Sequence, residues 1–288
     1  GRIASVGQPV STILKRHNYP KIVSILQAEA LALSACLSST LKFDGVFTLQ
    51  AKGNGLVRTL FADITTNGDL RGYASIDDNV GAFRKVSDGH DLDGSVELRP
   101  ILGEGYIAFT VDQGSIGGRY QGIVELDHRY LSDAAMRWYE NSEQLDTIVI
   151  CAAAERHEGW RAVALMLQRI ADYGGDREKK LCTDVVQAKS DDAWHTAKTL
   201  LASITRKEIL DSALSPENIV FRLFNSMAPH SAPARPVNDR CRCDVEKVES
   251  MLQQFSEEEI MDLADGHGNL VITCEFCKIS RTVHHSVI

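Results

Sequence analysis

The chain has 288 residues, of which 44% are hydrophobic and 24% are charged, and its formal net charge is −8. These proportions are ordinary for a globular protein and leave room for one large domain and a smaller one. The negative charge disfavours general nucleic-acid binding, which depends on neutralising phosphates. No apolar run is expected to be long enough to span a bilayer and no signal peptide is visible, so we predict a cytoplasmic protein with no membrane partner.

The first long apolar stretch covers residues 21–41. Its side chains are mostly apolar or small and alternate too little for a half-exposed strand, so we predict a largely buried helix. Cys36 lies within this stretch and is interpreted as a small core residue.

Glycine-punctuated strands are predicted for residues 43–124. Fourteen of the 21 glycines lie between Gly45 and Gly122, and glycine-rich turns between short alternating runs are typical of antiparallel hairpins. The sequences at 53–55 and 117–118 are interpreted as turns. The first lacks the helix and the Lys-Ser/Thr that a phosphate-binding loop needs, and no nucleotide site is supported.

Residues 120–175 are predicted to mix strands and a helix. Strands are expected at 120–126 and 147–151, with a further apolar run at 162–167, and Ser132 or Asp133 can cap a helix between them. Together with the preceding hairpins, this pattern predicts an α+β domain over residues 1–175. Three histidines here and just downstream have no sequence-adjacent Ser, Cys or carboxylate partner and are interpreted as surface or core residues: His128, His157 and His195.

A helical linker is predicted over residues 176–227. It carries eight basic and eight acidic residues and so has no net charge. Short amphipathic helices of this kind need tertiary packing to stay folded, so the segment is either a plain connector or an element that is folded only while its neighbours hold it. Three helix starts are indicated by capping residues: Asp191 or Asp192, Thr205 with Glu208, and Ser215 before Pro216.

A small C-terminal domain is predicted over residues 228–288. Three of the seven prolines fall between 229 and 236, which favours an extended, non-helical start. A unit this small can build little core and commonly needs a metal to fold. Within it we expect a helix at 244–252, a second helix capped by Ser256 with Glu259, and strands at 269–273 and 278–283.

Two cysteine pairs distinguish this last domain: Cys241 and Cys243 form a CxC, and Cys274 and Cys277 form a CxxC thirty residues later. Four thiolates in two close pairs can surround one tetrahedral ion, and soft sulfur ligands with this geometry select zinc. Clustered structural thiols or a secreted disulfide framework are the alternatives. The other three cysteines (Cys36, Cys151 and Cys182) stand alone, which suits a reducing compartment better than an oxidising one.

Other chemistry is disfavoured for this zinc site. Four thiolates leave no open position for a catalytic water, and replacement of one by His267, His284 or His285 would leave a cysteine spare. A thioredoxin-like CxxC belongs at the start of a helix, whereas this one lies between two predicted strands. The region from Cys241 onward has a net charge of −5, from four basic and nine acidic residues, which disfavours nucleic-acid binding by a zinc ribbon.

The same site permits an oxidation switch. Metal binding keeps the thiols deprotonated and contributes to folding, so oxidising the cysteines removes the ligands and the folding free energy together. Each close pair has a second thiol at hand to convert a sulfenic acid into a disulfide. Chemistry alone does not say what such a switch would control.

The cysteine motifs resemble those of a known family, the 33-kilodalton heat-shock redox-regulated chaperones (HslO type), and the resemblance covers nearly the whole chain. It rests on Arg240–Cys243, followed by the acidic helical pair, and on Cys274–Cys277. After the second pair the family usually has an aromatic-rich strand, whereas this chain has residues 278–283 and a short tail. Supporting matches lie at residues 120–124, 142–145, 200–201 and 218–224.

The resemblance implies an N-terminal substrate-binding domain, a redox-sensitive helical linker and a C-terminal zinc domain. One zinc per chain would be held by the four cysteines in the reduced, inactive state. Peroxide or hypochlorous acid with unfolding conditions would release zinc and form the Cys241–Cys243 and Cys274–Cys277 disulfides. The zinc domain and linker would then unfold and expose apolar surface to unfolding client proteins, with dimerisation and without ATP.

We therefore predict a non-enzymatic, oxidation-activated holdase that protects unfolding proteins from aggregation under oxidative stress. A zinc-stabilised protein–protein adaptor with a purely structural metal is the second hypothesis, and a zinc-dependent redox enzyme is the third.

Overall fold

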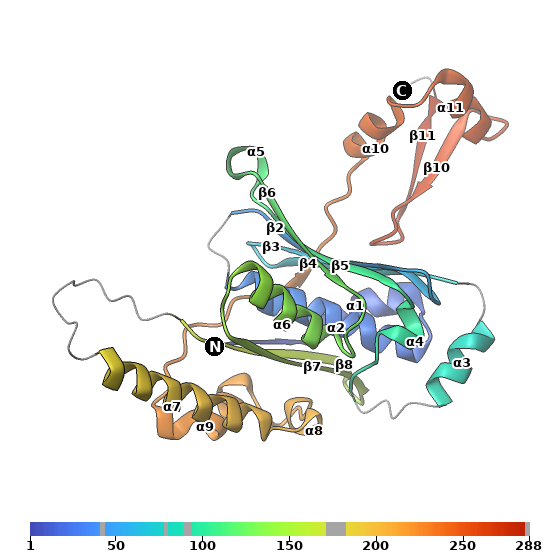
Figure 1. The fold of residues 1–288 in the computed structure, drawn as a ribbon. Coiled ribbons are helices and arrows are strands. Elements are labelled where there is room, and N and C mark those ends of the chain that lie inside the picture. The colour runs from blue at the N-terminus through green and yellow to red at the C-terminus, as the bar shows by residue number, and fades with distance from the viewer. Residues whose placement is uncertain (41–43, 78–79, 89–93, 171–182, 286–288) are drawn as a thin grey trace.

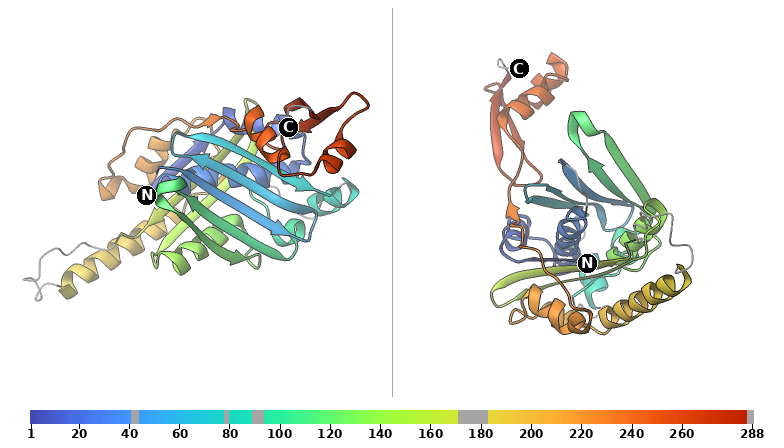
Figure 2. Two further views of the ribbon diagram at one scale, coloured as in Figure 1. Left: turned by 90° about the horizontal axis from the view of Figure 1, so that it is seen from above. Right: turned by 90° about the vertical axis from the view of Figure 1, so that its left-hand side faces the viewer.

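A computed structural model of the chain describes residues 1–40, 44–77, 80–88, 94–170 and 183–285. It contains two main sheets with helices between them, helices outside the smaller sheet, and a projecting C-terminal hairpin unit (Figures 1 and 2). The predicted α+β class is confirmed. The predicted boundary at residue 175 lies outside the described residues, and the one at residue 227 stays a prediction.

The larger sheet has the strand order β6-β5-β2-β3-β4-β9. Its neighbours are antiparallel except for β9, which runs parallel to β4. The predicted glycine-punctuated hairpins are thus confirmed, although β9 was not expected. The strands are β2 (Val46–Gly53), β3 (Val57–Thr65), β4 (Asp69–Ile76), β5 (Gly105–Asp112), β6 (Arg119–Glu125) and β9 (Asn238–Asp239).

The smaller sheet has the order β1-β8-β7, all antiparallel. The apolar runs predicted at 147–151 and 162–167 form its two long strands, which extend further than the runs themselves. The first strand was not predicted, because its pairing with β8 joins opposite ends of the domain. The strands are β1 (Arg2–Val6), β7 (Thr147–Arg156) and β8 (Gly159–Gln168).

Three helices fill the space between the sheets: α1 (Gln8–His17), α2 (Lys21–Ser38) and α6 (Leu131–Ser142) (Figure 1). Helix α2 is the centre of the core, since every residue from Ile22 to Leu37 is buried. It approaches β4 at Gly72, where an added Cβ would lie 2.5 Å from Gln27 Nε2 and 2.6 Å from the carbonyl oxygen of Phe61. The amide of Gln27 donates to that carbonyl at 3.0 Å.

Helix α2 also corrects one expectation. Its 18-residue window has a mean hydropathy of 1.4, which makes it long and apolar enough to cross a membrane by length and composition. The expectation that no such run exists was therefore wrong. In the structure 89% of the window is buried between the two sheets, as in the core helix of a globular protein.

Short helices interrupt the strands on the rim of the larger sheet: α3 (Val80–Asp88), α4 (Arg99–Leu102) and α5 (Gly114–Gly117). Helix α6 begins at Leu131, one residue before Ser132, the earlier of the two predicted caps. Asp133 lies in the first turn and accepts from the backbone N–H of Tyr130 at 3.0 Å, so neither Ser132 nor Asp133 is the N-cap.

The linker region forms α7 (Thr183–Ala202), α8 (Arg206–Ile209), α9 (Pro216–Phe224) and the 3-10 turn η1 (Asn225–Met227). The predicted caps of α8 and α9 are confirmed, because Thr205 accepts from the Glu208 N–H and Ser215 from the Asn218 N–H. The prediction that Asp191 or Asp192 starts a helix was wrong. Both lie inside α7, which begins at Thr183.

These linker helices cover the outer face of the smaller sheet (Figure 1). Strand alternation sends Ala164 and Met166 of β8 into the central core, whereas Leu165 points outward. Leu165 packs there in a second cluster with Leu201, Ile219 and Phe224. Ile209 and Leu210 form a third cluster with Ala152 and Val163 of the same sheet.

The C-terminal module follows an exposed extended stretch at 228–236. Its predicted elements are confirmed with small shifts, and Ser256 caps α11 by accepting from the Glu259 N–H. Among the described residues its apolar cluster has four buried side chains, Leu252, Ile260, Leu270 and Val283. The elements are α10 (Val245–Leu252), α11 (Glu257–Leu263), β10 (Asn269–Thr273) and β11 (Ser280–His284).

One buried acid lies in α2 and gives a test of the packing. Glu29 is 1% exposed, and its Oε1 accepts from Ser95 Oγ at 2.6 Å. Burial, opposed by the Ser95 hydrogen bond and the charge of Arg206, raises the pKa of Glu29 to about 8. The folded chain therefore keeps a proton that the unfolded chain loses above about pH 4.5.

We expect Glu29 to cost stability as the pH rises. Because the pKa of Glu29 is higher in the folded chain than in the unfolded one, its contribution to stability is fully present below the unfolded pKa. The free energy of unfolding should then fall by roughly 3 kcal/mol between about pH 5 and 7.5. Glu29→Gln should remove that slope from urea-unfolding free energies, whereas Glu140→Gln at an exposed position should keep it. Equal slopes for Glu29→Gln and the wild type would show that this carboxyl is not protonated in the fold.

Candidate metal centre

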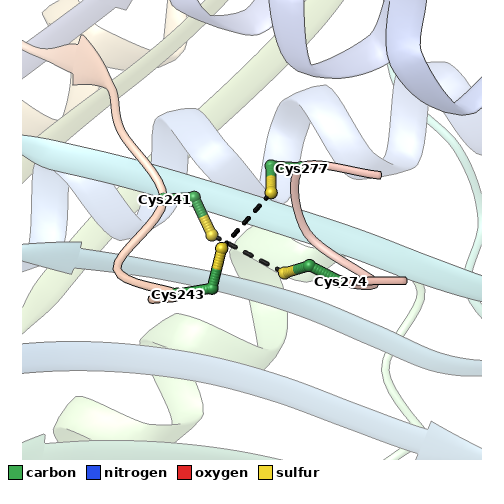
Figure 3. Close-up of side chains that lie close together, drawn as sticks. All are labelled: Cys241, Cys243, Cys274 and Cys277. Carbon is green, nitrogen blue, oxygen red and sulfur yellow. Dashed lines mark hydrogen bonds between the residues drawn. The ribbon is translucent and has the colours of Figure 1, made fainter. Parts of the chain in front are cut away.

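The four cysteines of the two predicted pairs converge in the structure (Figure 3). Cys241 and Cys243 lie between β9 and α10, whereas Cys274 and Cys277 lie in the turn between β10 and β11. The Sγ atoms of Cys241 and Cys274 are 3.7 Å apart, and those of Cys243 and Cys277 are 3.5 Å apart. All four sulfurs lie within 4.8 Å of one another.

This arrangement could hold one metal ion. Zinc–sulfur bonds of about 2.3 Å in a tetrahedron separate the sulfurs by about 3.8 Å, close to the 3.7 Å and 3.5 Å observed here. A set of four soft sulfur donors suits zinc better than a hard cation such as magnesium or calcium. Within the described part of the chain no histidine joins this group, and His284 and His285 instead pack on each other with ring centroids 4.6 Å apart.

The turn between β10 and β11 positions the second cysteine pair, Cys274 and Cys277. The β10–β11 hairpin ends with Thr273 opposite Ser280, which leaves the six residues between them to form the turn. The N–H of Cys274 donates to the carbonyl of Ile279 at 3.0 Å, and the N–H of Lys278 donates to the carbonyl of Cys274 at 2.8 Å. Lys278 has φ 56°, so this turn uses a left-handed position without glycine.

The first pair is positioned by the start of α10. Asp244, expected as the first residue of the helix, instead caps it by accepting from the Lys247 N–H at 2.7 Å. The Nζ of Lys247 folds back to donate to the carbonyl of Arg242 at 2.9 Å. The segment from 242 to 244 is thereby tied to the helix that follows it.

Charge around the sulfurs is uneven. The guanidinium of Arg281 donates to Cys243 Sγ at 3.4 Å and to the Cys243 carbonyl at 3.2 Å. Burial acts to raise the pKa of Cys243, but hydrogen bonds from Arg281 and the neighbouring thiols lower it to about 7. Burial raises the pKa of Cys241, and it raises the pKa of Cys277 to about 12. The cluster thus has one acidic thiol and at least two that hold their protons until a cation replaces them.

Sequence reasoning located all four cysteines but not the residues around them. Arg281 was noted only as one charge in an acidic segment, and nothing in its sequence context indicates the contact with Cys243. His17, in α1, was not considered at all, yet its Nε2 donates to the carbonyl of Phe276 at 3.2 Å. Both contacts join residues that only the fold brings together.

The other cysteines and histidines form no comparable site among the described residues. Cys36 and Cys151 are buried free thiols in the core, as Cys36 was expected to be, and Cys182 lies outside the described residues. His128 pairs with the neighbouring Asp127 at 3.3 Å. His157 and His195 are exposed.

Known proteins resemble the chain over nearly its full length. A family model described as "Hsp33 protein" matches residues 1–283. The "33 kDa chaperonin" of Caulobacter vibrioides is 32% identical over 281 residues, covering 96% of this chain and 88% of that protein. The "33 kDa chaperonin" of Pseudomonas savastanoi pv. phaseolicola is 31% identical over 279 residues, covering 96% and 84%.

A solved structure shows the same fold. The crystal structure of the 33 kDa chaperonin (Hsp33) of Thermotoga maritima at 2.20 Å resolution matches with a TM-score of 0.73 and 17% sequence identity. The match covers 99% of this chain and 90% of that one. The resemblance predicted from the two cysteine motifs is confirmed, and the chain belongs to the Hsp33 family of chaperones.

Proposed function

We propose that the protein is a redox-regulated, ATP-independent holdase of the cytoplasm. It is inactive while reduced and zinc-bound, and it is activated when its zinc-ligand cysteines are oxidised. The observation that carries the proposal is the cluster of four free thiols in a member of a chaperone family. A closed four-sulfur site is suited to sensing oxidants rather than to catalysis, so no enzymatic turnover is expected.

In this proposal Cys241, Cys243, Cys274 and Cys277 hold one zinc per chain in the reduced state. Zinc supplies a charge that keeps all four sulfurs as thiolates and joins the two segments that carry them. Its binding contributes roughly 10–16 kcal/mol of apparent folding free energy in small zinc peptides. The apolar cluster of the module, with four buried side chains among the described residues, is too small to supply a comparable free energy.

Oxidation would proceed within each close pair. One cysteine is oxidised by hydrogen peroxide to a sulfenic acid, and one water is released. The second thiol of the pair then attacks that sulfur, forming a disulfide and releasing a second water. Two electrons per pair are thereby transferred to one peroxide. The products would be the Cys241–Cys243 and Cys274–Cys277 disulfides, and sulfurs in disulfides no longer bind zinc as thiolates.

The linker is the element that the switch would release. The proposed domains are a substrate-binding core (1–175), a redox-sensitive linker (176–227) and a zinc domain (228–288). The linker helices cover apolar side chains on the outer face of the smaller sheet, including Ile3 and Leu165. Their unfolding would leave this face open to unfolding client proteins, and to a second copy of the chain in a homodimer.

Single serine substitutions test the metal ligands. Replacing any one of the four cysteines, for example Cys274→Ser, should weaken zinc binding by about tenfold or more in competition with a chromophoric chelator, because three sulfurs hold zinc less well than four. Cys151→Ala, a buried thiol outside the cluster, should keep one zinc per chain. Unchanged zinc affinity in all four serine variants would contradict the assignment.

Oxidation should turn chaperone activity on. Peroxide at a temperature that loosens the module should release about one zinc per chain and suppress light scattering by a thermally unfolding client. The reduced, zinc-loaded protein should leave that scattering unchanged. Zinc release without suppression would favour a zinc-stabilised adaptor with a structural metal, and catalytic turnover of a disulfide substrate would favour a redox enzyme.

Amide exchange should locate the element that is released. Across the linker, and in particular α7 and α9, protection should fall by about tenfold or more on oxidation, since short helices lose their order when their packing is lost. Strand β2, in the middle of the larger sheet, is the internal control and should stay protected. Unchanged exchange in α7 and α9 would mean that the linker does not respond to the cysteines.

A further inference from the structure

A second face of the core is covered in this structure, on the side of the larger sheet away from α2. Strand alternation turns Leu60 and Ala62 of β3 toward the helices, and Phe61 and Asp63 outward. Their partners across the ladder are Tyr73 and Arg71 of β4. These four residues, Phe61, Asp63, Arg71 and Tyr73, are called the β3–β4 face below. The C-terminal module lies on this side of the sheet (Figures 1 and 2).

The aromatic part of this face is occupied by Phe276. Its ring meets the ring of Phe61 edge-on, with centroids 5.3 Å apart, and that of Tyr73 with centroids 4.9 Å apart. The guanidinium of Arg71 lies 4.0 Å from the centroid of the Phe276 ring. Edge-to-face pairs and a cation over a ring are the arrangements that the charge distribution of aromatic rings favours.

The charged part is occupied by Arg242. The side chain of Asp63 is 2% exposed and accepts from Arg71, through Nε at 3.1 Å and Nη2 at 3.0 Å. Arg242 of the module adds a third donor, with Nη2 at 2.7 Å from Asp63 Oδ2. A carboxylate this buried is stable only while cationic donors surround it, so the site prefers a second guanidinium or ammonium beside Arg71.

Both occupants lie inside the cysteine pairs. Arg242 stands between Cys241 and Cys243, and Phe276 between Cys274 and Cys277. A metal held by the four sulfurs would fix the backbone on each side of both residues. The two contacts are therefore made or lost together with the arrangement of the sulfurs.

We propose that the β3–β4 face is a client-binding surface that Phe276 and Arg242 occupy in the reduced protein. Once the module is released, the face accepts an aromatic side chain and a nearby basic side chain of an unfolded polypeptide. The occupants in this structure define that chemistry, because they supply one ring to Phe61 and Tyr73 and one guanidinium to Asp63. This surface is separate from the one under α7–α9, and the inference rests on the proposed function.

Peptide binding tests the surface. The probe is a fluorescein-labelled, unstructured peptide with one phenylalanine and one arginine among serines and glycines. Two sister peptides lack either the phenylalanine or the arginine. Peroxide-treated protein should bind the parent peptide at least tenfold more tightly than reduced protein does, and Tyr73→Ser or Phe61→Thr should weaken that binding by about tenfold. Circular dichroism identifies variants that keep their fold.

The matched control lies on the same face of the same sheet. Ile123 of β6 is 59% exposed, and its pairing with Ala108 places it on the outer side. Ile123→Thr removes a comparable apolar side chain far from β3 and β4, and should leave peptide affinity unchanged. Equal affinity for all three peptides, or no effect of Tyr73→Ser, would overturn the inference.

Crosslinking in the wild-type protein avoids any question of folding. A peptide with benzoylphenylalanine in place of its phenylalanine should, after peroxide treatment, crosslink to residues between Val57 and Ile76. Crosslinks confined to β7 and β8 would place client binding under the linker alone and overturn the inference, while the holdase function would stand. Failure of oxidised wild-type protein to suppress client aggregation would instead overturn the proposed function.

Removing the occupant tests whether the module blocks the face. Phe276→Ala should keep one zinc per chain, because the four sulfurs are untouched, yet bind the parent peptide about tenfold more tightly than wild type before any oxidation. Glu275→Gln is the control, since Glu275 is exposed and forms an ion pair with Lys278 of the same turn. Peptide affinity of reduced Phe276→Ala equal to that of reduced wild type would show that Phe276 does not cover a binding site.

Discussion

The convergence of four sulfurs is the constraint on which the C-terminal half of the structure depends. The apolar cluster of the module has four buried side chains among the described residues, and Met261, Leu263 and Val271 are largely exposed. A unit of this size buries too little apolar surface to offset the entropy of ordering its chain. Its helices and hairpin are held together where the CxC segment meets the CxxC turn, so a change at the sulfurs acts on the whole module.

The N-terminal core has the opposite character. Helix α2 is buried between two sheets, and the cluster around it is large and continuous. Each sheet also has an outer face that a later part of the chain covers: α7–α9 lie on β1-β8-β7, and the module contacts β3 and β4 (Figure 2). The extended stretch at 228–236 and β9 carry the chain from one side to the other. The covering segments thus have smaller apolar clusters than the core that they cover.

Local signals predicted local structure well. Ser215 and Ser256 cap the helices that their sequences indicate, because a capping hydroxyl and its target N–H are three residues apart. The four cysteines that lie together in the structure were found because their spacing is itself the signal. The pairing of Ile3 with Leu165 and the contact of Arg242 with Asp63 were not found. Each joins residues far apart in sequence, and nothing near either residue indicates its partner.

The contacts of the module with the sheet and the binding of a metal differ greatly in free energy. An aromatic pair contributes about 0.5–1.5 kcal/mol beyond its buried area, whereas zinc binding contributes roughly 10–16 kcal/mol in small zinc peptides. The contacts of Phe276 and Arg242 are therefore too weak to hold the module folded or to expel a bound metal. They are strong enough to keep an already ordered module against the sheet. In the proposed mechanism, loss of the metal would therefore release the β3–β4 face, whereas separation from the face would leave the metal in place.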